Sequence, residues 1–357
     1  MRRLAFLSVF MSLAGAASAD GLDGAALRGS SGFEMPARGA PVYAADAPEP
    51  YYPLDADVPV EAPVVSPLVP ELHELRVEIG GRFWYSTGSF AKNLYDDPRF
   101  SSNLNSRLTY DALSGRSFEL FARIDHASGF FLKGYVGLGS ISAGMLHDED
   151  FPPAIVPYSN TLSDQHKGTL SYVTVDYGYN FLLTPTYRVG PFVGVSVFRE
   201  SVNGYGCTQT QINPFICVPA IPAATLAITE NAEWQAARLG IAGDVLLFDC
   251  LRIGAEAAWV PYAHMQAFDD HWLRPDILKP INEPATGSGV QLEAFASYQL
   301  SPAFSIGAGA RYWHLTAKGQ IELEDAEQFI AAIPQPGTFS TDRYGLFAQA
   351  AYKFGMD

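Results

Sequence analysis

The sequence of 357 residues is poor in three features that would assign it to common classes. After its N-terminus it has no run of about 18 apolar residues, so no α-helix is expected to span a membrane. Basic residues are scarce, because 23 Lys and Arg stand against 38 Asp and Glu and give a formal net charge of −15. Nucleic-acid phosphates would be repelled by this charge, so no nucleic-acid partner is expected.

The chain begins with MRRLAFLSVFMSLAGAASAD, in which two arginines precede an apolar run and small residues follow it. This order is typical of a secretory signal peptide over residues 1–19, and the apolar run is too short to span a bilayer as a helix. Residues 20–73 are rich in proline, alanine and acidic residues and have no hydrophobic period. We expect them to form a disordered or polyproline-like periplasmic segment, which leaves residues 74–357 as the folded domain.

Cysteine is the third scarce feature, with three residues in the chain. Cys207 and Cys217 lie close together in YGCTQTQINPFICVP, and in an oxidising compartment a small loop disulfide is expected between them. Cys250 is then unpaired and is expected to be a small apolar filler.

From residue 74 onward the sequence alternates between apolar and polar residues with a period of two, which predicts β-strands. In GVQLEAFASYQL, for example, Val290 and Leu292 share one face while Gln291 and Glu293 share the other. About ten such stretches occur, near residues 74–86, 116–125, 129–141, 169–182, 187–199, 234–247, 251–263, 289–300, 303–316 and 342–354.

These stretches are longer than the strands of soluble proteins and have about the length that a tilted strand needs to cross a bilayer. Charges of both signs alternate with glycine on the polar face, as expected for a closed lumen filled with ion pairs, and aromatic residues gather near the ends of the stretches. Short connections alternate with long ones over residues 87–115, 142–168, 200–233, 264–288 and 317–341. The sequence therefore predicts an all-β fold: a transmembrane antiparallel β-barrel of about ten strands with five long extracellular loops, in the outer membrane of a Gram-negative bacterium.

Two acidic clusters follow the third and seventh of these stretches. GMLHDEDFPP places Asp148 and Asp150 at the start of the second long loop, and AFDDHWLRP places Asp269, Asp270 and His271 at the start of the fourth. Four strands separate the two positions in a barrel of ten, so the clusters are expected to face each other across its mouth. An imidazole that is hydrogen-bonded to one acid and faces two others can, together with them, bind and deprotonate a water molecule.

This arrangement resembles the omptin family of outer-membrane proteases, and the likeness extends over roughly Leu75 to Phe354. Omptins are ten-stranded barrels that activate water with an Asp-x-Asp couple and an Asp-x-His dyad; Asp148 and Asp150 match the couple, and Asp269 and His271 match the dyad. The resemblance implies endopeptidase activity on a peptide or protein substrate, a monomer in outer-membrane lipid, no metal or other cofactor, and a requirement for lipopolysaccharide, for which Arg199 matches a contact residue. The acidic residues with which some omptins bind basic substrates are replaced by Lys92 and Ala267, so cleavage specificity stays open.

Two other functions compete with this interpretation. The barrel would be non-enzymatic if it served as a structural protein, an adhesin or a narrow pore, although a lumen dense in Arg and Glu disfavours bulk diffusion. A metal site is the second alternative, because His147, His166, His264 and His271 all fall near the outer rim.

Overall fold

The computed structural model describes residues 74–96, 103–151, 157–277, 280–323 and 334–356. The predicted signal peptide and proline-rich segment lie outside the described residues. No helix long and apolar enough to cross a membrane occurs in the part of the chain that is described.

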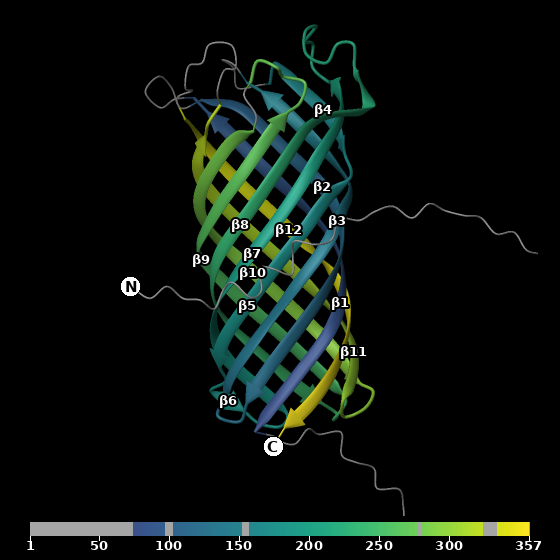
Figure 1. Ribbon diagram of the computed structural model, residues 1–357, viewed down its shortest axis with the longest axis vertical. Helices are drawn as coiled ribbons and strands as arrows, with labels where there is room; N and C mark the ends of the chain where they lie inside the picture. Colours follow the sequence, from purple (N-terminus) through teal and green to yellow (C-terminus); the bar gives the residue numbers. More distant parts are fainter. Residues whose placement is uncertain (1–73, 97–102, 152–156, 278–279, 324–333, 357) are drawn as a thin grey trace, which may run out of the picture. The chain divides into compact units, whose positions relative to one another are not determined.

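The described residues form one antiparallel sheet that closes on itself. Ten positions make the ring in the order β1, β2, β3, β4 with β5, β7, β8, β9, β10, β11 and β12, and β12 pairs with β1 (Figure 1). β4 and β5 occupy one position because both lie between β3 and β7, whereas β6 is a two-residue segment paired with β7. The bounds are β1 (Leu75–Tyr95), β2 (Leu104–His126), β3 (Phe130–Asp150), β4 (Ser159–Gln165), β5 (Gly168–Tyr179), β6 (Leu182–Leu183), β7 (Tyr187–Gln209), β8 (Ile221–Leu247), β9 (Leu251–His271), β10 (Ile281–Gln299), β11 (Phe304–Ile321) and β12 (Gln335–Met356).

The ten-stranded barrel is therefore confirmed, but the predicted strand ends at the long-loop side were wrong. β9 was expected over residues 251–263 and runs to His271, and most of the predicted loop 264–288 belongs to β9 and β10. The alternation changes phase in β2 and β9, opposite the register shifts between Ser86 and Phe90 of β1 and between Gly287 and Gly289 of β10. A β-bulge adds one residue to a strand and exchanges its two faces, so the sequence pattern breaks while the hydrogen-bonded ladder continues.

The same alternation has opposite meaning in the two halves of the barrel. In the first part of β1, Arg82 is buried in the lumen while Phe83 and Tyr85 are half exposed on the outside. Farther along the strands the lumen side becomes apolar, with Phe90, Met265 and Ala267 fully buried. A spanning segment has lipid outside and polar groups inside, whereas its extension into water needs an apolar core inside.

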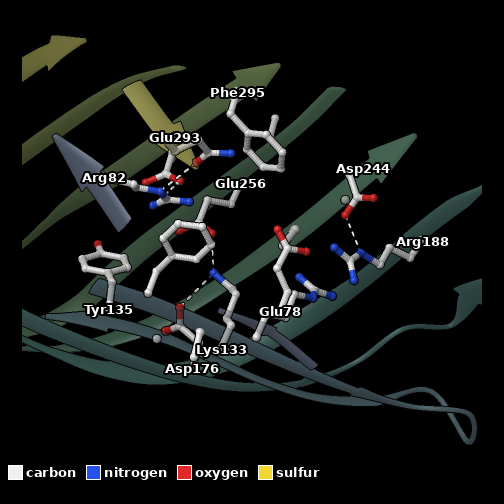
Figure 2. A pocket seen from close by; sticks show the side chains of 18 residues that line it. Glu78, Arg82, Lys133, Tyr135, Asp176, Arg188, Asp244, Glu256, Glu293 and Phe295 are labelled. Carbon is white, nitrogen blue, oxygen red and sulfur yellow. Dashed lines mark hydrogen bonds and ion pairs between the residues drawn. The ribbon is translucent and has the colours of Figure 1, made fainter. Parts of the chain in front are cut away.

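Layers of ion pairs fill the lumen of the spanning half, as the sequence predicted. Arg311 Nη1 donates to Glu119 Oε2 (2.7 Å) and Arg311 Nη2 to Glu293 Oε2 (2.6 Å), while Arg82 Nη1 lies 3.0 Å from Oε1 of each of the same two acids. Figure 2 shows the neighbouring layer, in which Lys133 lies between Asp176 and Glu256. The cavity among these charges measures about 80 Å³.

Candidate active site

Asp148 and Asp150 lie at the end of β3 rather than in a loop. Residues two apart on a strand point to the same face, and buried Leu146 identifies this face as the inner one. His147 and Glu149 have the opposite parity, and Glu149 Oε2 lies 3.8 Å from Nη1 of the half-exposed Arg107. The couple therefore faces the interior of the mouth, where β2 and β4 flank it.

Asp269 and His271 lie at the end of β9, across the ring from β3. His271 Nε2 is 2.8 Å from Asp269 Oδ2, and the side chain of Asp269 is 1% exposed. Asp269 pairs in register with Glu230 of β8 and with Ile281 of β10, so the backbone around it is held on both sides. Asp270 has the opposite strand parity, as expected for the middle residue of such a triplet.

A cavity of about 440 Å³ in the mouth brings the two clusters together, because Asp148, Asp150 and His271 all line it. Its volume lies within the range of about 300–1,000 Å³ that small-ligand sites have. Asp269 stands behind His271, away from the cavity lining. The four predicted residues are thus gathered around one space in which an acid couple and a carboxylate-imidazole pair face each other.

Lys92 of β1 completes the cluster, although the sequence predicted no role for it beyond replacing an acid. Its Nζ donates to Asp269 Oδ2 (2.5 Å), Glu230 Oε2 (2.7 Å) and Glu283 Oε1 (2.8 Å). All four side chains are at least 96% buried. Lys92 and His271 therefore share one oxygen of Asp269.

The position of Lys92 was not predictable because its partners come from β8, β9 and β10, which only the closed barrel brings opposite β1. The one available signal was strand parity: Lys92 follows Arg82, Trp84 and Phe90 on the inner face, and a lysine there must be paired.

Charge and burial together shift the titration of the site, which lies outside the membrane-spanning part. His271 ends the 21-residue β9, whereas a tilted strand crosses a bilayer in about 9–11 residues. Burial alone would raise the pKa of Asp269, but the charges of His271 and Lys92 and their hydrogen bonds outweigh it and hold that pKa well below its usual range. Burial would likewise lower the pKa of His271, and Asp269 more than offsets this and raises it.

The acid couple is shifted in the other direction. Burial, with the neighbouring charge of Asp150, raises the pKa of Asp148 to about 6. Burial also raises the pKa of Asp150, against the charge of Arg274. A carboxyl group and an imidazole whose pKa values are both raised, and which line one cavity, are groups suited to proton transfer.

The histidines that were considered as metal ligands do not point toward one common site. His166 stacks on Tyr205 at 3.9 Å between ring centroids, and His147 and His264 have the outward strand parity. Within the described ranges, the group of metal-ligating side chains that lie close enough is Glu230, Asp269 and Glu283, and the ammonium of Lys92 is bonded to all three.

The remaining predicted residues lie around the site. Cys207 and Cys217 form a disulfide, and both line the cavity. Arg199 lies half exposed on the outer wall, where its Nε is 2.5 Å from Glu233 Oε2.

No protein-family model matches the chain, and a search of curated proteins found no match. Among solved structures, the outer membrane protease OmpT from Escherichia coli matches with a TM-score of 0.69 at 12% identity, over 78% of this chain and 97% of that one. The chain has the fold of an outer-membrane β-barrel. At this identity the likeness shows the fold alone.

Two further barrels match more distantly. The outer membrane protein OprG from Pseudomonas aeruginosa matches with a TM-score of 0.31 at 10% identity, over 80% of this chain and 98% of that one. The translocator domain of the autotransporter NalP from Neisseria meningitidis matches with a TM-score of 0.32 at 10% identity, over 77% of this chain and 88% of that one.

Proposed function

We propose that the chain is an omptin-like endopeptidase of the Gram-negative outer membrane, which hydrolyses peptide bonds with a water molecule activated at the barrel mouth. The observation that supports this most directly is the hydrogen bond between His271 and the buried Asp269, beside a cavity that Asp148 and Asp150 also line. An imidazole held by an acid is the arrangement that a general base needs.

In the proposed mechanism His271 Nε2 donates its hydrogen bond to Asp269, so Nδ1 carries the lone pair that accepts a proton. A water molecule between His271 and the acid couple gives its proton to Nδ1 as its oxygen attacks the substrate carbonyl carbon. Asp148 accepts a hydrogen bond from the other O–H group of this water and so orients it, with Asp150 beside it. The imidazolium then returns the proton to the leaving amine, and Asp269 stabilises the imidazolium in between.

Lys92 is a positioning residue in this mechanism. Its ammonium fixes the same carboxylate oxygen that orients His271, and keeps Asp269 ionised against the neighbouring Glu230 and Glu283. An ionised Asp269 is required because a protonated carboxyl group would neither orient the imidazole nor stabilise its charged form.

A passive pore, the alternative function, is disfavoured by the ion-pair layers that cross the lumen. Arg311 of β11 reaches Glu119 of β2, and Lys133 of β3 reaches Glu256 of β9, so opposite walls are joined. The cavity left among these charges is about 80 Å³, which is room for a few water molecules.

The test is turnover of a diverse peptide library by the refolded full chain in lipopolysaccharide, since the resemblance implies that this lipid is needed. Asp148→Asn and His271→Ala are expected to abolish cleavage, whereas His147→Ala and Asp270→Asn, their neighbours of opposite strand parity, are expected to retain it. Equal cleavage by all five proteins would sink the mechanism. Loss of cleavage on adding a chelator would support the metal alternative, and solute flux through reconstituted liposomes would support the pore.

A further inference from the structure

Two kinds of side chain line the cavity at the mouth. The polar ones are the proposed catalytic side chains, the cation of Arg274, and Ser106, Thr161 and Ser163. The apolar ones, here called the apolar wall, are the disulfide with Phe215, Ile216, Ile221, Ile228 and Leu273. Apolar side chains are not needed to activate water, so their role must lie in what the cavity holds.

The apolar wall is built largely from one closed loop between β7 and β8. Cys207 pairs in register with Ile221, and the disulfide to Cys217 closes the loop again within it. Asn213 Oδ1 accepts hydrogen bonds from the backbone N–H groups of Phe215 (2.9 Å) and Ile216 (3.2 Å). These bonds fix the backbone that presents the two side chains to the cavity.

Phe215 is 89% exposed, although it lines the cavity. Its ring therefore stands at the open side with most of its surface in water. Covering that surface with an apolar group is favourable, because the hydrophobic effect scales with the apolar area removed from water.

The charges nearby indicate which ligand side chain this wall accepts. The buried acids Glu230 and Glu283 that would attract a basic side chain are bonded to Lys92 instead. Arg274, whose guanidinium is bonded to Asp276, already supplies a cation to the cavity, and Asp148 with Asp150 repels an acidic group. A neutral apolar side chain is the class that meets no like charge and has a wall to contact.

We propose that Phe215 and Ile216 form a subsite that binds a large apolar side chain of the substrate beside the bond that is cleaved. The proposal rests on the proposed function and names its substrate class: peptides with Phe, Leu or a similar residue next to the scissile bond. The disulfide holds the loop over the cavity, so it contributes to substrate binding and not to the proton transfers.

The test uses the refolded full chain and four peptides that are identical except for one residue, which is Phe, Leu, Ser or Lys. The Phe and Leu peptides are expected to be cleaved with kcat/KM about 10- to 100-fold above the Ser and Lys peptides, the range over which apolar pockets discriminate. The double substitution Phe215→Ser/Ile216→Ser should remove this preference by raising KM for the Phe and Leu peptides. Phe248→Ser is the matched control, because Phe248 is 86% exposed at the opposite end of the barrel, in the turn between β8 and β9.

Binding is measured separately from cleavage, by fluorescence anisotropy of the labelled Phe peptide on the His271→Ala protein. Weaker binding after reduction, or in Cys207→Ser/Cys217→Ser, is expected. Cleavage that His271→Ala abolishes but that is equal for all four peptides, or strongest for Lys, would overturn the subsite and leave the protease. Absence of cleavage with binding that depends on Phe215 would overturn the protease and leave the subsite as a peptide-binding site. Absence of both would overturn both.

Discussion

Two kinds of charge cluster occupy the interior of this barrel, and they differ in their balance. In the spanning half, Arg82 and Arg311 face Glu119 and Glu293, so two cations meet two anions. At the mouth, Lys92 alone meets Glu230, Asp269 and Glu283.

A balanced cluster has no group whose protonation must change, and it joins the walls of the barrel. An unbalanced one holds more negative charge than its cation neutralises, so the proton affinities of its members and of their neighbours are shifted. His271 supplies the second cation when it is protonated, and this couples the balance of the mouth cluster to the proposed proton transfer.

The largest expected effect comes from removing the acid that joins Lys92 to His271. Asp269→Asn keeps the shape of the side chain but cannot hold the imidazole in the required tautomer or stabilise its charged form. We expect kcat to fall by about 10³- to 10⁴-fold, as when the acid of a Ser-His-Asp triad is changed to an amide. Asp270→Asn, one position away, should stay within about 2-fold of the wild type, since alternation along β9 directs its side chain to the face opposite Asp269 and His271. Equal losses of kcat in the two variants would contradict the assignment of Asp269, and not Asp270, to the site.

The next prediction compares one cation from each cluster. Lys92→Met should lower kcat/KM by about 10- to 100-fold. Losses of this size occur in metal sites when a residue that orients a metal ligand through a hydrogen bond is replaced, and Lys92 orients Asp269 in a similar way. It should also move the acid limb of the pH profile to higher pH, because the positive charge of Lys92 lowers the pKa of His271. Arg311→Met should instead destabilise the barrel by about 3–5 kcal/mol and leave the pH profile in place, because it breaks a buried pair away from the site.

The controls for this comparison restore charge balance. Lys92→Met/Glu230→Gln/Glu283→Gln removes the cation together with two of its acids, so the variant should fold as well as the wild type in denaturant titrations. If the single variant kept the wild-type pH profile, Lys92 would be a structural residue of the same kind as Arg311.

The pH dependence follows from the shifts at the mouth. Because Asp269 raises the pKa of His271 above 6.5, the neutral imidazole forms only at higher pH, and kcat/KM should rise about 10-fold per pH unit on the acid side of that pKa.

The stability of the fold should change with pH in the opposite direction to the activity. The raised pKa of His271 gives stabilisation that is fully present below 6.5 and is lost as pH rises through the folded-state pKa. The raised pKa of Asp148 also gives stabilisation that is lost as pH rises, in this case between pH 3.8 and about 6. Activity and denaturation midpoints measured over pH 4–9 check both; a profile that is flat in both quantities would contradict the assigned shifts.

The sequence predicted one cluster better than the other, for a physical reason. The charges of the spanning half follow a strict period of two, so Glu119, Glu293 and Arg311 could be placed in the lumen from alternation. Asp148, Asp150, Asp269 and His271 were found because each pair lies within three residues of one strand. Lys92 meets its acids only after ten strands close, because Glu230, Asp269 and Glu283 come from three other strands, and a local sequence pattern does not show this closure. The strand ends were misplaced because bulges in β2 and β9 change the phase of the alternation.

The smallest expected effects sharpen the comparison within the acidic triplet on β3. Glu149 lies between the two proposed catalytic acids but has the outward parity, and Arg107 Nη1 lies 3.8 Å from its Oε2. Exposed ion pairs of this kind contribute about 0–1 kcal/mol, so Glu149→Gln should change neither kcat/KM nor the denaturation midpoint beyond experimental error. Asp150→Asn, the next residue, removes one of two acids that face the cavity and should lower kcat. The two substitutions are chemically alike and adjacent, so only the direction in which the strand points each side chain separates their outcomes. Equal kcat values for the two variants would mean that a solvent-exposed charge acts on the site as strongly as one that lines it.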